Sequence, residues 1–156
     1  MVRLSTVAFL ALLGCDEPAL APEAEPLVGR WRAPTETFEP KGSLERLFVV
    51  TAEGRSETWT TSRGLYAGQA ADALSSEIIL YGRVRVREGY FAIQPDSEVT
   101  RDLFYGPSHR SVKHEFTGWS ADSTRFEVRG DELLLEFYTY PADAPVRIQQ
   151  VLSRVP

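Results

Sequence analysis

The chain has 156 residues, of which 43% are hydrophobic, 25% charged and 11% aromatic, and this composition predicts one globular domain plus a short appendage. Its formal net charge is -5, whereas nucleic-acid-binding proteins carry basic surfaces, so we expect no nucleic-acid partner. The single cysteine, Cys15, excludes a disulfide within the folded part.

The N-terminal residues have the pattern of a secretory signal. Arg3 gives a positive start, residues 4–13 are almost entirely apolar, and Gly14 and Cys15 follow. The apolar run is shorter than the ~20 residues that a membrane-spanning helix needs. We therefore interpret residues 1–14 as a signal peptide that is removed after export.

The end of this signal carries a motif, Leu12-Leu13-Gly14-Cys15, that resembles the lipobox of bacterial lipoproteins. The resemblance implies that Cys15 is lipidated and becomes the first residue of the mature chain. Its partner is then a membrane of the bacterial cell envelope, inner or outer, with the domain outside the cytoplasm. Attachment through two or more acyl chains is stable without a membrane-spanning segment. The alternatives are an ordinary cleaved signal with a chance cysteine, or a buried N-terminal strand.

The segment that follows, residues 15–26, is a linker in this interpretation. It is rich in Pro, Ala and Glu, which bury too little apolar surface to become ordered, so we expect an extended spacer. The folded domain is expected to occupy residues 27–156.

Residues 27–156 show the alternation of β-strands. It is clearest in one run whose apolar or small residues share a face: Ile78, Leu80, Gly82, Val84 and Val86. The opposite face of that run carries Arg83, Arg85 and Arg87. One face is therefore buried and the other meets solvent, as in antiparallel sheets. The arginines either contact an acidic partner or form a charged surface that discourages edge pairing.

Three glycine-containing turns separate strand-like runs, at residues 53–54, 88–89 and 130–131. Because glycine accepts the positive φ of tight hairpin turns, they predict an up-and-down meander of about eight to ten strands. Residues 68–75 are the best helical candidate, and residues 66–76 are long enough to form a mobile loop. Closing the meander into a small antiparallel barrel hides its edges; the alternative is a two-sheet β-sandwich.

The start and end of this domain resemble those of lipocalin-like proteins. Gly29 and Trp31 match the Gly-x-Trp opening of that family, and Arg154 is the position for its late arginine. The resemblance implies that Trp31 plugs one end of the barrel, that Gly29 lets the chain bend, and that Arg154 packs over the indole. Residues 130–135 are also similar to a strand of bacterial lipocalin-like lipoproteins. A Thr-Asp-Tyr second motif and a long helix before the last strand are missing from the pattern.

The function predicted from these features is binding rather than catalysis. Aromatic residues in a barrel with internal space would form a ligand site for a small apolar or amphipathic molecule: Tyr66, Tyr81, Phe91, Phe137 and Tyr138. In a filled barrel they would be core, and the protein would act as a structural or interaction lipoprotein through its outer surface or loops. Whether the barrel is open or filled, the first strand with Trp31 is part of it. We expect the protein to be a monomer.

No catalytic or metal motif stands out in the sequence. There is no Gly-x-Ser-x-Gly elbow and no phosphate-binding glycine loop, so we expect neither an enzyme nor a cofactor. The most site-like segment holds His109 and His114 between Asp102 and Glu115. The spacing of its histidines is not a recognised zinc pattern, so a polar surface loop is the favoured interpretation and no metal is expected.

Overall fold

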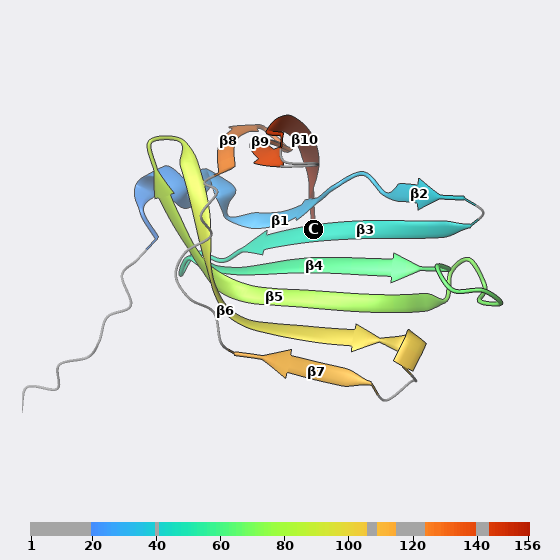
Figure 1. Ribbon diagram of the computed structural model, residues 1–156. Coiled ribbons are helices and arrows are strands. Elements are labelled where there is room, and N and C mark those ends of the chain that lie inside the picture. The colour runs from blue at the N-terminus through green and yellow to red at the C-terminus, as the bar shows by residue number, and fades with distance from the viewer. Residues whose placement is uncertain (1–19, 40, 106–108, 115–123, 140–143) are drawn as a thin grey trace, which may run out of the picture.

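The computed structural model describes residues 20–39, 41–105, 109–114, 124–139 and 144–156 (Figure 1). Its elements in chain order are the 3₁₀ helix η1 (Pro22–Leu27), β1 (Gly29–Arg32), β2 (Glu36–Phe38), β3 (Gly42–Val50), β4 (Arg55–Arg63), β5 (Leu74–Arg87), β6 (Tyr90–Asp102), the 3₁₀ helix η2 (Leu103–Tyr105), β7 (Arg110–Lys113), β8 (Thr124–Arg129), β9 (Glu132–Thr139) and β10 (Val146–Val155). None of the helices in these ranges has the length and apolar character to cross a membrane.

Eight of the strands close into an antiparallel barrel. The ring runs β1–β10–β9–β8–β6–β5–β4–β3, and β3 pairs with β1 to complete it. Strand β2 pairs with β3, and β7 pairs with β6, outside the ring. The predicted all-β, up-and-down barrel is confirmed, and the two-sheet sandwich is not the architecture found.

The barrel is narrow at one end and opens into a broad sheet at the other. In Figure 1 the long strands β3 to β6 extend as one sheet with β7, and β8, β9 and β10 lie over the end near η1. The fully buried side chains belong mostly to this end, among them Leu27, Trp31, Val50 and Leu133. The core therefore sits where the two halves of the barrel face each other.

The three predicted hairpin turns are present where the glycines indicated. Gly54 has φ +76° between β3 and β4, and Gly130 has φ +61° between β8 and β9. At the third turn, between β5 and β6, both Glu88 (φ +54°) and Gly89 (φ +79°) are left-handed. Two successive left-handed residues match the twist of the flanking strands, which is why this two-residue connection forms.

One local prediction, the extent of the spacer, was wrong. The expected extended spacer ends before Pro22, because Pro22–Leu27 forms η1 and buries Ala24 and Leu27 completely. These two side chains are three residues apart, so a 3₁₀ helix places both on one side, against the core. The best helical candidate, residues 68–75, contributes to two separate turns in the loop before β5, in which Gln69 N–H donates to Tyr66 O and Ala73 N–H to Ala70 O.

Candidate functional site

The closed end of the barrel is built around Trp31. Its side chain is completely buried, and its indole Nε1 donates a 2.8 Å hydrogen bond to Leu27 O in η1. The guanidinium carbon of Arg154 lies 4.1 Å from the centroid of the Trp31 ring, on the paired strand β10. The tryptophan thus fills this end of the interior with its one polar atom satisfied, which removes the cost of burying it.

Gly29 makes room for this arginine. Its φ is +142°, and a Cβ placed on it would lie 2.4 Å from Nη1 of Arg154. The same Nη1 donates a 2.9 Å hydrogen bond to Val28 O, and Nε of Arg154 lies 3.6 Å from Asp131 Oδ1 in the β8–β9 turn. Arg154 therefore connects the first strand, the last strand and the β8–β9 hairpin, and it can do so only beside a residue without a side chain.

An apolar cavity of about 250 Å³, open to solvent, lies between strands of the barrel. Its apolar lining includes Ala33, Phe48, Phe91, Ile93, Leu135, Phe137 and Leu152. The polar side chains in the lining are few: Arg46, Thr58, Thr124 and Gln150. Large apolar walls with a few polar groups are the usual composition of small-molecule binding sites.

The cavity wall is stiffened by contacts between aromatic rings. Phe48 and Phe91 are stacked with centroids 5.5 Å apart, and Phe91 meets Phe126 edge-on at 5.9 Å. Phe91 therefore holds one wall in place from two sides. Because these geometries are the favoured ones for aromatic pairs, they also add to the stability of the barrel.

A buried hydroxyl lies close to this wall. Ser56 is 2% exposed, and its Oγ has no hydrogen-bond partner among the described residues. It precedes the cavity-lining Thr58 by two residues on β4, so both side chains project from the same face of the strand. An unsatisfied buried hydroxyl costs stability, which makes Ser56 a weak point of the core.

An ion pair lies at the rim of the cavity. Nη1 of the cavity-lining Arg46 contacts Oε1 of Glu36, and the two side chains are 39% and 45% exposed. Glu36 is carried there by β2, where it is opposite Leu44 of β3. The only charged side chain among the cavity-lining residues that the structure describes is therefore already held by a carboxylate.

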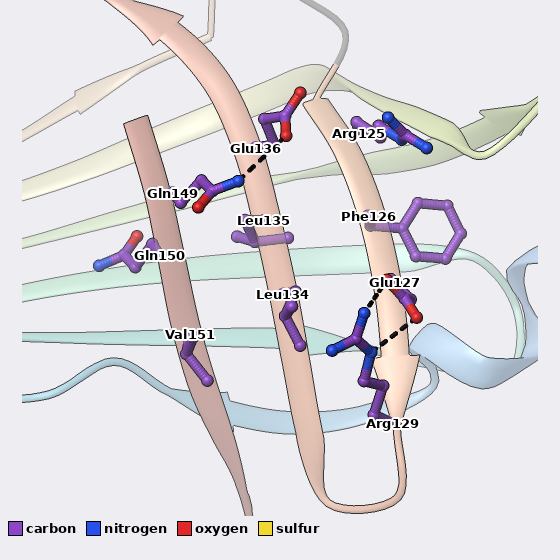
Figure 2. A pocket seen from close by; sticks show the side chains of 10 residues that line it. All are labelled: Arg125, Phe126, Glu127, Arg129, Leu134, Leu135, Glu136, Gln149, Gln150 and Val151. Carbon is purple, nitrogen blue, oxygen red and sulfur yellow. Dashed lines mark hydrogen bonds and ion pairs between the residues drawn. The ribbon is translucent and has the colours of Figure 1, made fainter. Parts of the chain in front are cut away.

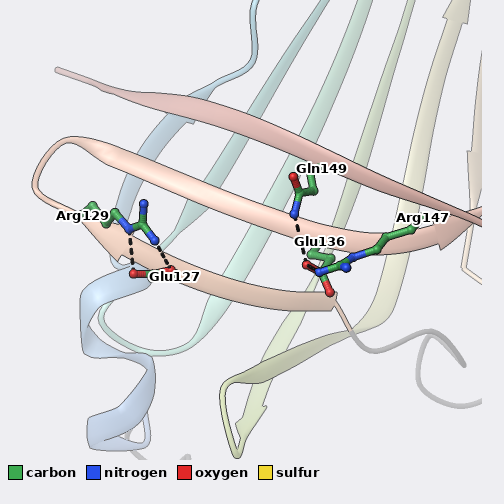
Figure 3. Close-up of polar contacts among 5 residues, drawn as sticks. All are labelled: Glu127, Arg129, Glu136, Arg147 and Gln149. Atoms are coloured by element: carbon green, nitrogen blue, oxygen red, sulfur yellow. Dashed lines mark hydrogen bonds and ion pairs between the residues drawn. The ribbon is translucent and has the colours of Figure 1, made fainter.

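A second depression, also of about 250 Å³, lies on β8, β9 and β10. Figure 2 shows Leu134 and Val151 between charged side chains at its two ends. At one end Arg129 donates to Glu127 through Nε at 2.7 Å and Nη2 at 2.8 Å; at the other, Glu136 accepts from Arg147 and from Gln149 (Figure 3). The hydrogen bond from Arg147 lowers the pKa of Glu136, and that from Arg129 lowers the pKa of Glu127. The acidic side chains here are thus engaged by neighbours.

Comparisons with known proteins do not assign a family. No protein-family model matches the chain, and no curated protein matches it. Among solved structures, the crystal structure of Rv2717c from M. tuberculosis is similar, with 15% sequence identity over 88% of this chain and 99% of that chain and a TM-score of 0.31. This likeness bears on neither ligand nor activity.

Two of the five aromatic residues predicted to bind a ligand line the cavity, Phe91 and Phe137. The other three lie elsewhere. Tyr66 donates a 2.8 Å hydrogen bond to Asp102, Tyr81 is opposite Glu57 on the outer face, and Tyr138 is 53% exposed opposite Arg147. Arg46, Thr124 and Gln150 line the cavity but were not predicted.

The remaining predicted features are on the surface or outside the described residues. Arg83, Arg85 and Arg87 are exposed on β5, and Nε of Arg87 lies 3.2 Å from Glu88. In the parts of the chain that the structure describes, no three or more His, Cys, Asp or Glu side chains are grouped to hold a metal ion. Cys15, the signal segment and Glu115 lie outside those parts.

The loop predicted to be mobile is held by several hydrogen bonds. Besides the bond from Tyr66 to Asp102, Ser75 Oγ donates to Gln69 Oε1 at 2.6 Å and accepts from Leu65 N at 2.9 Å. Arg63 and Lys41 donate to the carbonyl oxygens of Asp72 and Gln69. These bonds fix the connection between β4 and β5 to the neighbouring strands.

Proposed function

We propose that this chain is a non-enzymatic lipoprotein of the bacterial cell envelope whose barrel binds a small apolar or amphipathic molecule. The observation that carries the binding function is the apolar cavity of about 250 Å³ between strands of the barrel. It lies just below the ~300–1,000 Å³ that small-molecule sites usually enclose, so the ligand is small. The wall held by the stacked Phe48 and Phe91 gives it a preformed shape, which reduces the entropy that binding costs.

The tether is proposed from the lipobox-like residues, and the position of Leu20 indicates which end of the domain it would hold. Leu20 packs against the core, and its Cδ1 lies 3.2 Å from the position of a Cβ on Gly54. Leu20 is five positions after Cys15, so a lipid on Cys15 would be at most ~18 Å away along the chain. The end of the domain that carries η1 and Gly54 would then face the membrane.

The alternative is an interaction protein that works through its outer surface. Its best candidate is the depression on β8, β9 and β10, where Leu134 and Val151 form a small apolar floor. The charged side chains around that floor include two internal ion pairs, Arg129 with Glu127 and Arg147 with Glu136. A partner would have to compete with these contacts, whereas the cavity of the barrel offers apolar surface directly. We therefore favour ligand binding.

A cavity-filling variant tests the proposal. Ala33 is 3% exposed and lines the cavity, so Ala33→Leu should fill it and abolish saturable binding of small probes such as toluene and 1-octanol. Ala92→Leu is the matched control, because Ala92 is opposite Arg85 on the outer face of β6. Calorimetric titration of the purified protein and both variants measures the effect. No saturable binding by the wild-type protein would favour the interaction function instead.

A further inference from the structure

The cavity combines apolar walls with one cationic side chain. Among its lining residues that the structure describes, Arg46 alone carries a charge, and Arg46 is on the same face of β3 as the buried Phe48. A guanidinium presents a planar fork of donors that matches a carboxylate better than any neutral group. Arg46 therefore favours a ligand whose exposed end is a carboxylate.

We propose that the cavity takes a short-chain carboxylate whose apolar tail packs against Phe48, Phe91 and Phe137 and whose head is held by Arg46. This inference rests on the proposed ligand-binding function and narrows it to one class of ligand. The contact between Arg46 and Glu36 already shows a carboxylate bound at this guanidinium. The ligand head replaces Glu36 in that contact.

Glu36 is suited to being displaced. It lies on the three-residue strand β2, whose residues are all exposed and which in the described chain pairs with β3 alone. Its carboxylate can turn to water when a ligand arrives, because nearly half of the side chain is already exposed. If Glu36 stays in place, its negative charge repels the incoming head, so Glu36 also weakens binding.

The volume of the cavity limits the length of the tail. An engineered cavity of ~150 Å³ holds benzene, so about 250 Å³ holds roughly ten non-hydrogen atoms by proportion. Octanoate has that size. Hexadecanoate exceeds it and would have to leave much of its chain in water, so it gains little over octanoate from the cavity.

Calorimetric titration of the purified protein with octanoate, 1-octanol and hexadecanoate tests the class of ligand. Octanoate should bind at least tenfold more tightly than 1-octanol, and hexadecanoate should bind no more tightly than octanoate. Arg46→Gln should reduce the affinity for octanoate to that for 1-octanol and leave the affinity for 1-octanol unchanged. Glu36→Gln should raise the affinity for octanoate several-fold, because it removes the competing negative charge.

The matched control is Arg63→Gln. Arg63 also meets a carboxylate, with Nε 4.0 Å from Glu45 Oε1, but it is not among the cavity-lining residues, so the preference for octanoate over 1-octanol should be unchanged. Equal binding of octanoate and 1-octanol by the wild type would overturn the carboxylate inference and leave the binding function standing. Tighter binding of hexadecanoate would overturn the size limit. Binding of none of the three would overturn the proposed function itself.

Discussion

Arg154 stacks on Trp31 across the pairing of the last strand with the first, with its guanidinium carbon 4.1 Å from the ring centroid. The two residues come from opposite ends of the domain. The arginine also donates to Val28 O, while the tryptophan donates to Leu27 O. The side chains that close the barrel therefore also hold the C-terminal end of η1.

Trp31→Ala should lower the free energy of unfolding by ~3–5 kcal/mol, because it leaves a cavity where a fully buried ring and its hydrogen bond were. Chemical denaturation followed by circular dichroism measures the change. Trp59→Ala is the control, since Trp59 is only partly buried on β4 and bonds a glutamate two residues away. An equal loss in both variants would contradict a special role for Trp31.

Gly29→Ala should destabilise the barrel in two ways, by strain at φ +142° and by a clash with Arg154 Nη1. Strain of this kind costs ~1–3 kcal/mol, and the clash adds to it. In an Arg154→Met background the clash is relieved, so a double-mutant cycle should show that Gly29→Ala then costs less. Gly130 is the control: its φ is +61°, and a Cβ placed on it would have no other atom within 4 Å. The cost of Gly130→Ala should therefore be independent of Arg154. Additive costs at Gly29 and Arg154 would rule out the clash.

Two buried serines should respond in opposite ways to replacement by alanine. Ser56 Oγ has no partner among the described residues, so Ser56→Ala should leave the stability unchanged or raise it. Ser75 is completely buried and bonds Gln69 and Leu65, so Ser75→Ala should cost ~1–3 kcal/mol. Parallel urea denaturation of the two variants checks this. A loss at Ser56 comparable to that at Ser75 would show that the Ser56 hydroxyl has a partner.

The meander could be predicted because its signals are local. A tight turn requires positive φ at Gly54, Gly89 and Gly130, and alternation correctly places Val84 and Val86 of β5 in the core. It was wrong in the first half of β5, where Ile78 is 36% exposed and Ile79 on the opposite face is buried. The short edge strands β2 and β7 and the helix η1 have no such signal. Their conformation depends on partners far along the chain, as when Leu27 joins a core that includes Val84 and Leu133, so composition alone suggested an extended linker.

The same alternation explains which binding residues were predicted correctly and which were not. Phe137 and Tyr138 are adjacent in β9, so only one can face inward, and Phe137 does. Tyr81 lies between Leu80 and Gly82, which were assigned to the inner face, so it had to point outward. Counting aromatic residues ignored this constraint. The same alternation could have identified Arg46, because Arg46 lies on the same face of β3 as Phe48 and Val50.

Asp102 gives a prediction for the dependence of stability on pH. Hydrogen bonds from Phe104 N–H at 2.9 Å and Tyr66 OH at 2.8 Å lower the pKa of its carboxyl from the ordinary value of 3.8. A pKa lowered by folding means that the ionised form stabilises the fold above the unfolded pKa, and that this contribution is lost as the pH falls through the folded pKa. The stability difference between wild type and Asp102→Asn should therefore vanish in strong acid. NMR titration should find the pKa nearer 3.8 in Tyr66→Phe, and an unchanged pKa there would exclude the tyrosine as a cause.

The proposed tether makes a prediction about covalent chemistry. Mass spectrometry of the membrane fraction should find Cys15 as the first residue of the mature chain, carrying a diacylglyceryl group, with residues 1–14 removed. Cys15→Ser removes the thiol that takes the lipid, so it should either release the domain from membranes or leave an uncleaved precursor. In both cases the barrel should keep its wild-type melting temperature, because the closed end is completed by residues from Leu20 onward, such as Ala24 and Leu27. An unmodified Cys15, or a mature N-terminus at another residue, would refute the lipoprotein assignment while leaving the cavity and its ligand to be tested separately.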